Sequence, residues 1–365
     1  VALLAGGYSP GYPCHVSPKK MRTHPIGTGP FKFVSLKQNE HVKFVKNQNY
    51  WKKGLPHLDG INWTIIKSRS TRVLAFVAGK FDFTFNVDVT IPLLKDVKAQ
   101  APHAICELVT TNVSFNLIVN QFKPPFDNAK IRKAMVMTMD RKAFIDILSE
   151  GQNVQGGAMM PPPSGVWGMP PEFLKTVAGY SSDVAGNRAK ARKIMESLGY
   201  GPDNKLKVKV STRNIAVYRD PAVILIDHMK EIYIDATLDT VETSNWHAKV
   251  ARKNYMVGLN LTGIGVDDPD ANFYENYSCG SQRNYTGYCK PEMEALFEKQ
   301  SMMEDQAARK KLVWEIDKKL QEDAARPMIM HGKAAQCWQP YVKGFVTHVN
   351  SIYNNWRMED VWLDK

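Results

Sequence analysis

The chain has 365 residues, of which 44% are hydrophobic and 23% charged, and this composition excludes a wholly disordered protein. Its length favours two domains. The net charge of +12 comes from cations spread along the sequence without a nucleic-acid-binding motif, so we expect a basic surface and no nucleic-acid partner. No apolar run approaches the roughly 18 residues that a membrane helix needs.

Strands dominate the predicted structure near the start of the chain. Alternating apolar residues predict three of them, at 31–36, 41–45 and 60–66. A helix is expected over 70–78, where Val73, Leu74 and Val77 share one face and Gly79 is suited to end it.

The middle of the chain contains a long β-rich stretch at 110–119, which ends before Pro124. Asp127 or Asn128 is expected to cap the helix that follows. The proline- and glycine-rich segment 156–171 is interpreted as a surface excursion, because helices and strands resume after it.

Helices and strands alternate in the second half of the chain. Asn187 is expected to cap a helix that ends at Gly199. The elements that follow are strand 206–210, helix 221–232, strand 236–241, helix 246–252 and strand 255–261, and then a long helix carrying Leu312, Ile316 and Leu320. This alternation predicts an α/β sheet covered by helices.

The five cysteines form no CxxC motif and no Cys/His pattern that suits zinc. Cys279 and Cys289 flank a short loop rich in Gly, Ser, Asn and Tyr, and from spacing alone a disulfide and two free thiols are equally compatible with the sequence. Cys14, Cys106 and Cys337 are expected to remain free or be buried.

Three carboxylates, Asp267, Asp268 and Asp270, lie in a loop after a predicted strand and beside Gly263 and Gly265. In α/β sheets such loops often bind ligands, and these residues could hold a cation or a ligand ammonium. The alternative is a solvated acidic turn that caps the helix beginning near Ala271. The sequence leaves both interpretations open.

Trp246 opens a predicted helix whose last turn carries Arg252, a combination that suits a ligand with an apolar body and an acidic group. A core tryptophan beside an exposed arginine explains the same pattern equally well. Motifs of catalysis and phosphate binding are absent, and the nine histidines are scattered as surface or packing residues. We therefore expect no enzyme activity, metal or cofactor.

Several motifs resemble family 5 of the extracellular solute-binding proteins, the dipeptide-, oligopeptide- and nickel-binding receptors of ABC importers. They are His24-Pro-Ile-Gly-Thr-Gly-Pro-Phe31 with Asn49-Tyr-Trp51, Gly79-Lys-Phe-Asp82, Lys123-Pro-Pro-Phe-Asp127, Met139-Asp-Arg141, the helix before Tyr200, and Asp268-Pro-Asp270. They occur in the family's order and cover essentially the whole chain.

The resemblance implies a two-lobed periplasmic-binding-protein fold of type 2, in which ligand binding closes the lobes and the closed form docks on permease subunits in the inner membrane. It implies a partial first lobe at 1–112, a second α/β lobe at 113–335 and a return segment at 336–365. Family members carry a signal peptide and a longer N-terminal portion, so the first lobe is expected to be incomplete. The implied protein is a periplasmic monomer.

The resemblance also implies a disulfide between Cys279 and Cys289. The ligand-binding residues that it suggests are Asn112, Phe115, Asn116, Trp246, Arg252, Gly263, Ile264, Asp267 and Asp268. Peptide-binding members place an aspartate after the strand that ends here at Gly263, and Ile264 stands at that position. Burying an ammonium without a counter-charge costs several kcal/mol, so we expect a neutral or anionic solute rather than a free-amino peptide.

The leading hypothesis is thus a receptor that captures a small solute, peptide-like or a small organic acid, for an ABC importer. Two alternatives remain from the sequence: a hydrolase or transferase that uses Asp267 or Asp268 as general base, and a chaperone-like surface protein with the same fold.

Overall fold

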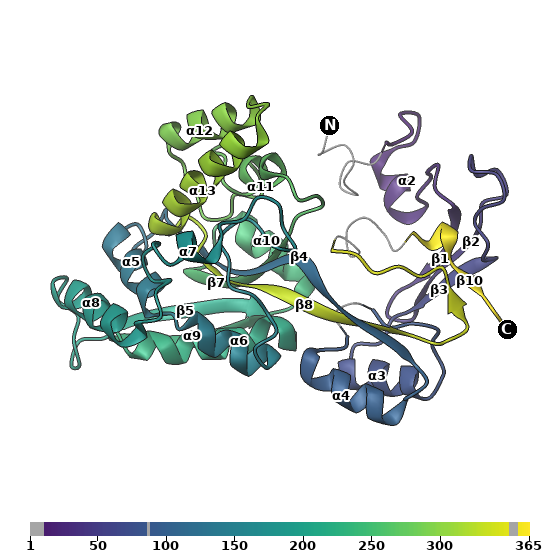
Figure 1. Cartoon of the computed structure of the whole chain (residues 1–365), viewed down its shortest axis with the longest axis horizontal. Helices are drawn as coiled ribbons and strands as arrows, with labels where there is room; N and C mark the ends of the chain where they lie inside the picture. Colours follow the sequence, from purple (N-terminus) through teal and green to yellow (C-terminus); the bar gives the residue numbers. More distant parts are fainter. Residues whose placement is uncertain (1–10, 86–87, 350–356) are drawn as a thin grey trace. The chain divides into compact units, whose positions relative to one another are not determined.

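A computed structural model describes residues 11–85, 88–349 and 357–365, and the chain divides into two compact units (Figure 1). Unit 1 comprises Leu3–Thr111 and Lys333–Lys365, and unit 2 comprises Asn112–Gly332. Both divisions fall inside long strands, β4 (Ile105–Val119) and β8 (Met328–Trp338). The sequence predicted lobe boundaries after residues 112 and 335, which lie one and three residues beyond these divisions.

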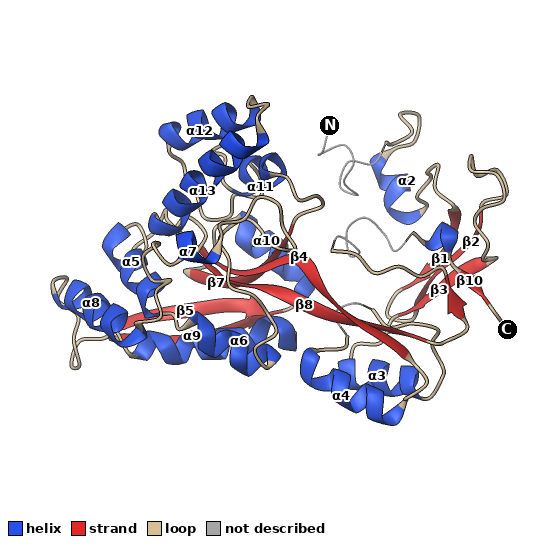
Figure 2. Ribbon diagram, viewed as in Figure 1, coloured by secondary structure: helices blue, strands red, loops and turns tan. Residues whose placement is uncertain are grey.

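Unit 2 is built on a five-stranded mixed sheet with the order β6-β5-β7-β4-β8. Figure 2 draws the strands in red. The strands between the two long ones are β5 (Leu206–Arg213), β6 (Ile234–Val241) and β7 (Val257–Gly263). β5 runs parallel to β6 and β7, whereas β4 and β7 are antiparallel. The α/β sheet predicted from the alternation of elements is confirmed.

Helices cover both faces of this sheet. They are α5 (Ala129–Thr138), α6 (Arg141–Ser149), α7 (Pro171–Leu174), α8 (Val184–Glu196), α9 (Ala216–Lys230), α10 (Thr243–Ala251), α11 (Pro269–Asn276), α12 (Pro291–Ser301) and α13 (Gln306–Glu322). One sheet face packs against α5, α6, α8 and α9 around side chains such as Leu117 and Val210. On the other face, Ile118 packs against Trp246 of α10. Successive strand residues point to opposite faces, so the two cores follow directly from sequence alternation.

Two expected helix starts are wrong. Asp183 rather than Asn187 caps α8, since its carboxylate accepts a hydrogen bond from the Gly186 amide, and Asn187 lies buried inside the helix. Aspartate and asparagine are both favoured at this position, so residue type alone does not locate the cap. α9 begins at Ala216, five residues before Pro221, so the proline that suggested a first turn lies within the helix.

Unit 1 contains the antiparallel sheet β1 (Phe31–Lys37), β2 (His41–Lys46) and β3 (Gly60–Thr64), as the alternation predicted. Its other elements are α2 (Pro18–Thr23), α3 (Arg69–Val77), α4 (Ile91–Gln100), the short pair β9 (Val342–Lys343) and β10 (Trp362–Leu363), and a 3₁₀ turn at Met358–Asp360. Among the described residues, most of the exposed large apolar side chains belong to this unit, including Tyr12 (68% exposed) and Trp51 (72%).

Two disulfides are present in the described residues. Cys106 of β4 bonds Cys337 of β8, within unit 1, so the expectation that these two cysteines have no disulfide partner is wrong. They are 231 residues apart and meet only because β4 and β8 are neighbours in the sheet, which spacing along the chain does not indicate. Cys14 is free and exposed.

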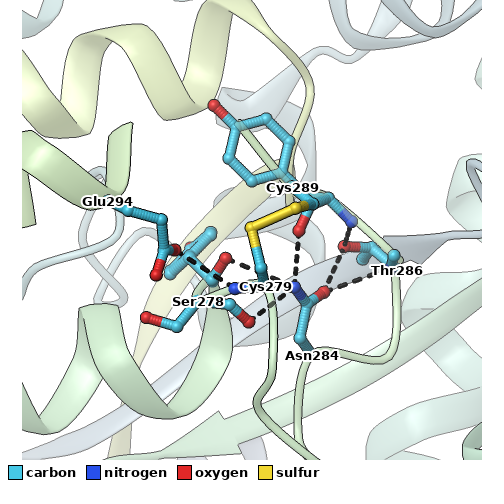
Figure 3. The surroundings of a disulfide bond; sticks show 9 residues. Ser278, Cys279, Asn284, Thr286, Cys289 and Glu294 are labelled. Atoms are coloured by element: carbon cyan, nitrogen blue, oxygen red, sulfur yellow. Dashed lines mark hydrogen bonds between the residues drawn. A yellow bond between two sulfur atoms is a disulfide. The ribbon is translucent and has the colours of Figure 1, made fainter. Parts of the chain in front are cut away.

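The predicted disulfide between Cys279 and Cys289 is confirmed (Figure 3). The loop that it closes is organised by Asn284, whose amide donates to the carbonyls of Tyr277 (3.2 Å), Ser278 (3.0 Å) and Tyr288 (2.6 Å). Asn284 is only 4% exposed. The disulfide therefore closes a loop that already has a buried polar centre.

Candidate functional site

The carboxyl end of β7 is bound to the neighbouring segment of β4. The Ile264 amide donates to the Asn112 carbonyl at 3.1 Å, and the Asn112 side-chain amide donates to the Ile264 carbonyl at 3.0 Å. Asn112 is 2% exposed and Ile264 is 4% exposed. These two hydrogen bonds fix Gly263 and the start of the acidic loop at the carboxyl end of β7. Ligand-binding loops of α/β sheets are commonly found at such strand ends.

A ladder of buried polar side chains runs along one face of the β4–β7 pair. Ser114 lies opposite Thr262 and Asn116 lies opposite Asn260, and all four are buried. Asn116 donates to the Ser114 carbonyl, and Asn260 donates to the Thr262 hydroxyl. Phe115 points to the other face, where it belongs to the hydrophobic core. The structure thus places Asn116, but not Phe115, on the polar face.

Arg326, which we did not single out from the sequence, contacts this ladder. It is 2% exposed and donates to the Thr262 hydroxyl (3.2 Å), the Asn276 side-chain oxygen (2.5 Å) and the Arg283 carbonyl (3.0 Å). Among the described residues no carboxylate lies within ion-pair distance, and burial lowers the pKa of the Arg326 guanidinium. A buried cation that is compensated only by neutral groups creates a positive electrostatic potential around the neighbouring polar side chains of β4 and β7. The sequence places Arg326 between Ala325 and a buried apolar strand. Arginine is almost never fully buried unless it is paired, so an arginine in such surroundings could have been singled out.

Asp267 is held by the proline- and glycine-rich excursion. Its Oδ2 accepts from the Val166 amide at 2.7 Å, and its carbonyl accepts from Trp167 Nε1 at 3.0 Å. Oδ1 is buried and has no hydrogen-bond partner in the described part of the chain. Burial raises the pKa of the Asp267 carboxyl, which makes it a poor permanent counter-ion for a ligand ammonium.

Asp268 has a structural role. Its carboxylate caps α11 by accepting from the Asp270 amide at 2.9 Å, and it also lies 3.4 Å from the Arg309 guanidinium. Arg309 additionally contacts Asp270 and covers the Trp167 ring, with 4.6 Å between the guanidinium carbon and the ring centroid. The interpretation of this loop as an acidic turn that caps a helix is therefore confirmed for Asp268.

Trp246 and Arg252 lie elsewhere in unit 2. Trp246 is 1% exposed and packs in the core beside Gly258 of β7. Gly258 and Gly263 are five residues apart in this strand, which corresponds to about 17 Å at the rise of a β-strand. Arg252 is exposed, and its Nε donates to the Ala248 carbonyl of its own helix. This pair corresponds to a core tryptophan beside an exposed arginine. The structure brings together Asn112, Gly263, Ile264, Asp267 and Asp268.

Replacing Asp268 by Ala should lower the free energy of unfolding by about 1–2 kcal/mol, because α11 loses its cap and Arg309 loses a partner. Asp268→Asn keeps the capping acceptor and should retain most of the stability. Urea unfolding of both variants, followed by circular dichroism, tests this assignment. Equal destabilisation by the two substitutions would show that the cap is unimportant.

In the described residues no helix is long and apolar enough to cross a membrane. In the same residues, no three His, Cys, Asp or Glu side chains are grouped in a way that could hold a metal ion.

Comparison with known proteins gives a consistent result. Residues 7–284 match the family model described as bacterial extracellular solute-binding proteins, family 5 middle. The chain is 25% identical over 339 residues to the heme-binding protein A of Haemophilus influenzae, covering 90% of this chain and 58% of that protein. It is 29% identical over 268 residues to a glutathione-binding protein of Escherichia coli, covering 72% of this chain and 46% of that protein. The chain therefore spans about half the length of these curated relatives.

Solved structures show the same fold. The oligopeptide-binding protein OppA of Haemophilus influenzae, in complex with a peptide, superposes with a TM-score of 0.81 at 21% identity, covering 93% of this chain and 65% of that one. The dipeptide-binding protein of a Pseudoalteromonas species, in complex with Met-Leu, gives 0.78 at 22% identity, covering 89% and 63%. The expected two-lobed periplasmic-binding-protein fold is thus confirmed.

Proposed function

Because the chain belongs to family 5 of the bacterial extracellular solute-binding proteins, which are receptors rather than enzymes, we propose that it is a solute receptor of an ABC importer. The family match and the shared fold support a binding role. In this proposal the carboxyl end of β7 contributes to the ligand site through Asn112, Gly263 and Ile264.

The two units correspond in this proposal to the two lobes of the fold, with boundaries near residues 112 and 333. The chain passes from unit 1 to unit 2 along β4 and returns along β8, so the residues near these boundaries are the proposed hinge. Partners would be permease subunits in the inner membrane. Two disulfides suit the periplasm, which is oxidising and is reached through a signal peptide.

The ligand class follows from the charges around the β7 loop. Asp268 is occupied by the α11 cap and by Arg309, and the pKa of Asp267 is raised by burial. Ile264 offers no charge at the position where the family resemblance implies an aspartate in peptide-binding members. Arg326, in contrast, is a buried cation without a carboxylate partner among the described residues. We therefore propose a neutral or anionic solute, and the observation that carries this proposal is the engagement of Asp268 by Arg309.

Calorimetry can test the ligand class, with glutathione and Ala-Ala as probes and mass spectrometry to identify any small molecule that co-purifies. We expect an anionic or neutral solute to bind at micromolar or lower concentration, and an anionic one to bind at least about tenfold more weakly to Arg326→Met. Arg252→Ala removes an exposed arginine that lies outside the β7 loop, and this variant should bind the solute as the unmodified chain does.

Micromolar binding of Ala-Ala that is lost in Asp268→Ala would overturn the proposed ligand class. A ligand that saturates the site at about 100 times its Kd should stabilise the protein by about 2.7 kcal/mol. If no solute, including any that co-purifies, stabilises the protein, the receptor proposal fails and a non-transport role on the same fold is favoured.

A further inference from the structure

Unit 2 contains a cavity of about 600 Å³ that is separate from the β7 loop. It lies between the start of α6, the short helix α7 and the segment that leads into α8. Much of its lining is apolar and includes Ile145, Pro161, Met169 and Leu174. Its volume is within the range of about 300–1,000 Å³ that is usual for small-molecule sites.

Arg141 forms part of the cavity wall and is 3% exposed. Its Nε donates to the Met328 carbonyl at 2.9 Å, and its Nη1 donates to the Gly179 carbonyl at 2.7 Å. The guanidinium carbon lies 3.7 Å from the centroid of the Tyr180 ring. Nη2 is buried and has no hydrogen-bond partner among the residues that the structure describes.

The charge of Arg141 is therefore balanced by two neutral carbonyl groups and an aromatic ring, and no carboxylate of the described residues lies within ion-pair distance. A buried cation without a counter-charge is costly, and burial lowers the pKa of the Arg141 guanidinium accordingly. An anion beside it would remove part of this cost.

The other charged residues of the cavity wall do not neutralise the charge of Arg141. Asp140 is engaged as the N-cap of α6, where its carboxylate accepts from the Ala143 amide at 3.0 Å and the helix dipole offsets its charge. Lys142 forms an ion pair with Asp146. Lys175 is exposed at the cavity and adds a further cation.

We propose that this cavity binds a small monocarboxylate with an apolar body. The carboxylate lies beside the Arg141 guanidinium and offsets its charge, and the apolar body packs against Ile145 and Leu174. This site is independent of the proposed receptor function, because none of its lining residues belongs to the β7 loop.

Methyl NMR on the whole chain can test the proposal, because Met139 and Met169 line the cavity. Met302, the C-cap residue of α12, is 76% exposed and does not line the cavity, so it serves as the reference. The probes are 4-phenylbutyrate and 4-phenylbutan-1-ol, which share a body and differ in charge. We expect 4-phenylbutyrate to shift the methyl signals of Met139 and Met169 with a Kd of about 1 mM or lower, and the alcohol to bind about tenfold more weakly. The Met302 signal should not move.

Two cavity variants and one control complete the test. Ile145→Trp places a large side chain in the cavity and should abolish the shifts. Arg141→Met removes the charge and keeps an apolar side chain, so it should weaken 4-phenylbutyrate binding and leave the alcohol unaffected; if this variant does not fold, Ile145→Trp still decides. Lys230→Ala, at an exposed residue of α9 outside the cavity, is the control and should bind 4-phenylbutyrate as the unmodified chain does.

Equal affinity for the acid and the alcohol would overturn the proposal, because the cavity would then be merely apolar. Shifts that persist in Ile145→Trp, or no shift at 10-fold above the expected Kd of about 1 mM, would overturn it as well. Failure of this test leaves the receptor proposal unaffected, since that proposal is measured with other probes and other variants.

Discussion

Replacing both Cys106 and Cys337 by Ala is expected to lower the free energy of global unfolding by about 5 kcal/mol. In the chain-entropy model, a disulfide stabilises by restricting the unfolded chain, and the effect grows with the length of the closed loop. The two cysteines are 231 residues apart, whereas Cys279 and Cys289 are only 10 apart. The shorter loop should contribute about 3 kcal/mol by the same relation.

Guanidinium unfolding of the two double variants under oxidising conditions provides the measurement, with Cys279→Ala/Cys289→Ala as the matched control. Cys14→Ala should leave stability unchanged, because this thiol is free and exposed. If the short-loop variant proved the less stable of the two, loop length would not govern disulfide stabilisation in this protein.

Acidification from pH 6 to pH 4 is expected to change the stability of two single variants in opposite directions. Burial lowers the pKa of His331 to about 4 and raises the pKa of Asp317 to about 6. The two side chains hold the same loop: His331 Nε2 donates to the Gly157 carbonyl at 2.9 Å, and the Asp317 carboxylate accepts from the amides of Ala158 (2.7 Å) and Met159 (3.3 Å).

The signs follow from proton linkage. A depressed histidine pKa stabilises the folded state above the unfolded value near 6.5, and this contribution is lost as the pH falls through 4. A raised aspartate pKa stabilises the folded state below the unfolded value of 3.8, and this contribution is lost as the pH rises through 6. Each contribution amounts to about 3 kcal/mol, since one pKa unit corresponds to about 1.4 kcal/mol. They largely cancel between pH 4 and pH 6.

When one of the two groups is removed, the pH dependence of stability that the other group causes is no longer cancelled. Relative to the unmodified protein, His331→Gln should gain stability as the pH falls from 6 to 4, and Asp317→Asn should lose stability over the same interval. Urea unfolding at several pH values measures both slopes, and the other ionisable groups cancel in the comparison. Parallel pH profiles for both variants and the unmodified protein would contradict the opposed titration.

The elements that the sequence predicted well are those whose signal is local. Strict alternation over 206–210 identified β5, and the spacing of Leu312, Ile316 and Leu320 identified α13. The sheet order was not predictable, because β4 and β8 become neighbours through contacts that no local pattern encodes. The same limit explains why the Cys106–Cys337 bond was missed and the short Cys279–Cys289 loop was recognised.

The loop after β7 was predictable from the sequence, whereas the contacts of its carboxylates were not. Turn residues after a strand marked the loop at 264–268, but the roles of Asp267 and Asp268 depend on Val166 and Arg309, which lie far away in the sequence. Trp246 illustrates the same difficulty, since an aromatic residue beside a basic one has the same pattern in a pocket and in a core. Burial decides between them, and burial is a tertiary property.

The long-range disulfide also imposes an order on biosynthesis. A ribosome extends the chain from the N-terminus at roughly 5–20 residues per second, so Cys106 emerges well before Cys337. During this interval Cys14, and then Cys279 and Cys289, can react with Cys106, although none of them is its native partner. Uncatalysed exchange of a wrong disulfide takes minutes to hours. Efficient maturation therefore requires either that Cys106 stays reduced until Cys337 arrives, or that a thiol–disulfide isomerase corrects its first bond.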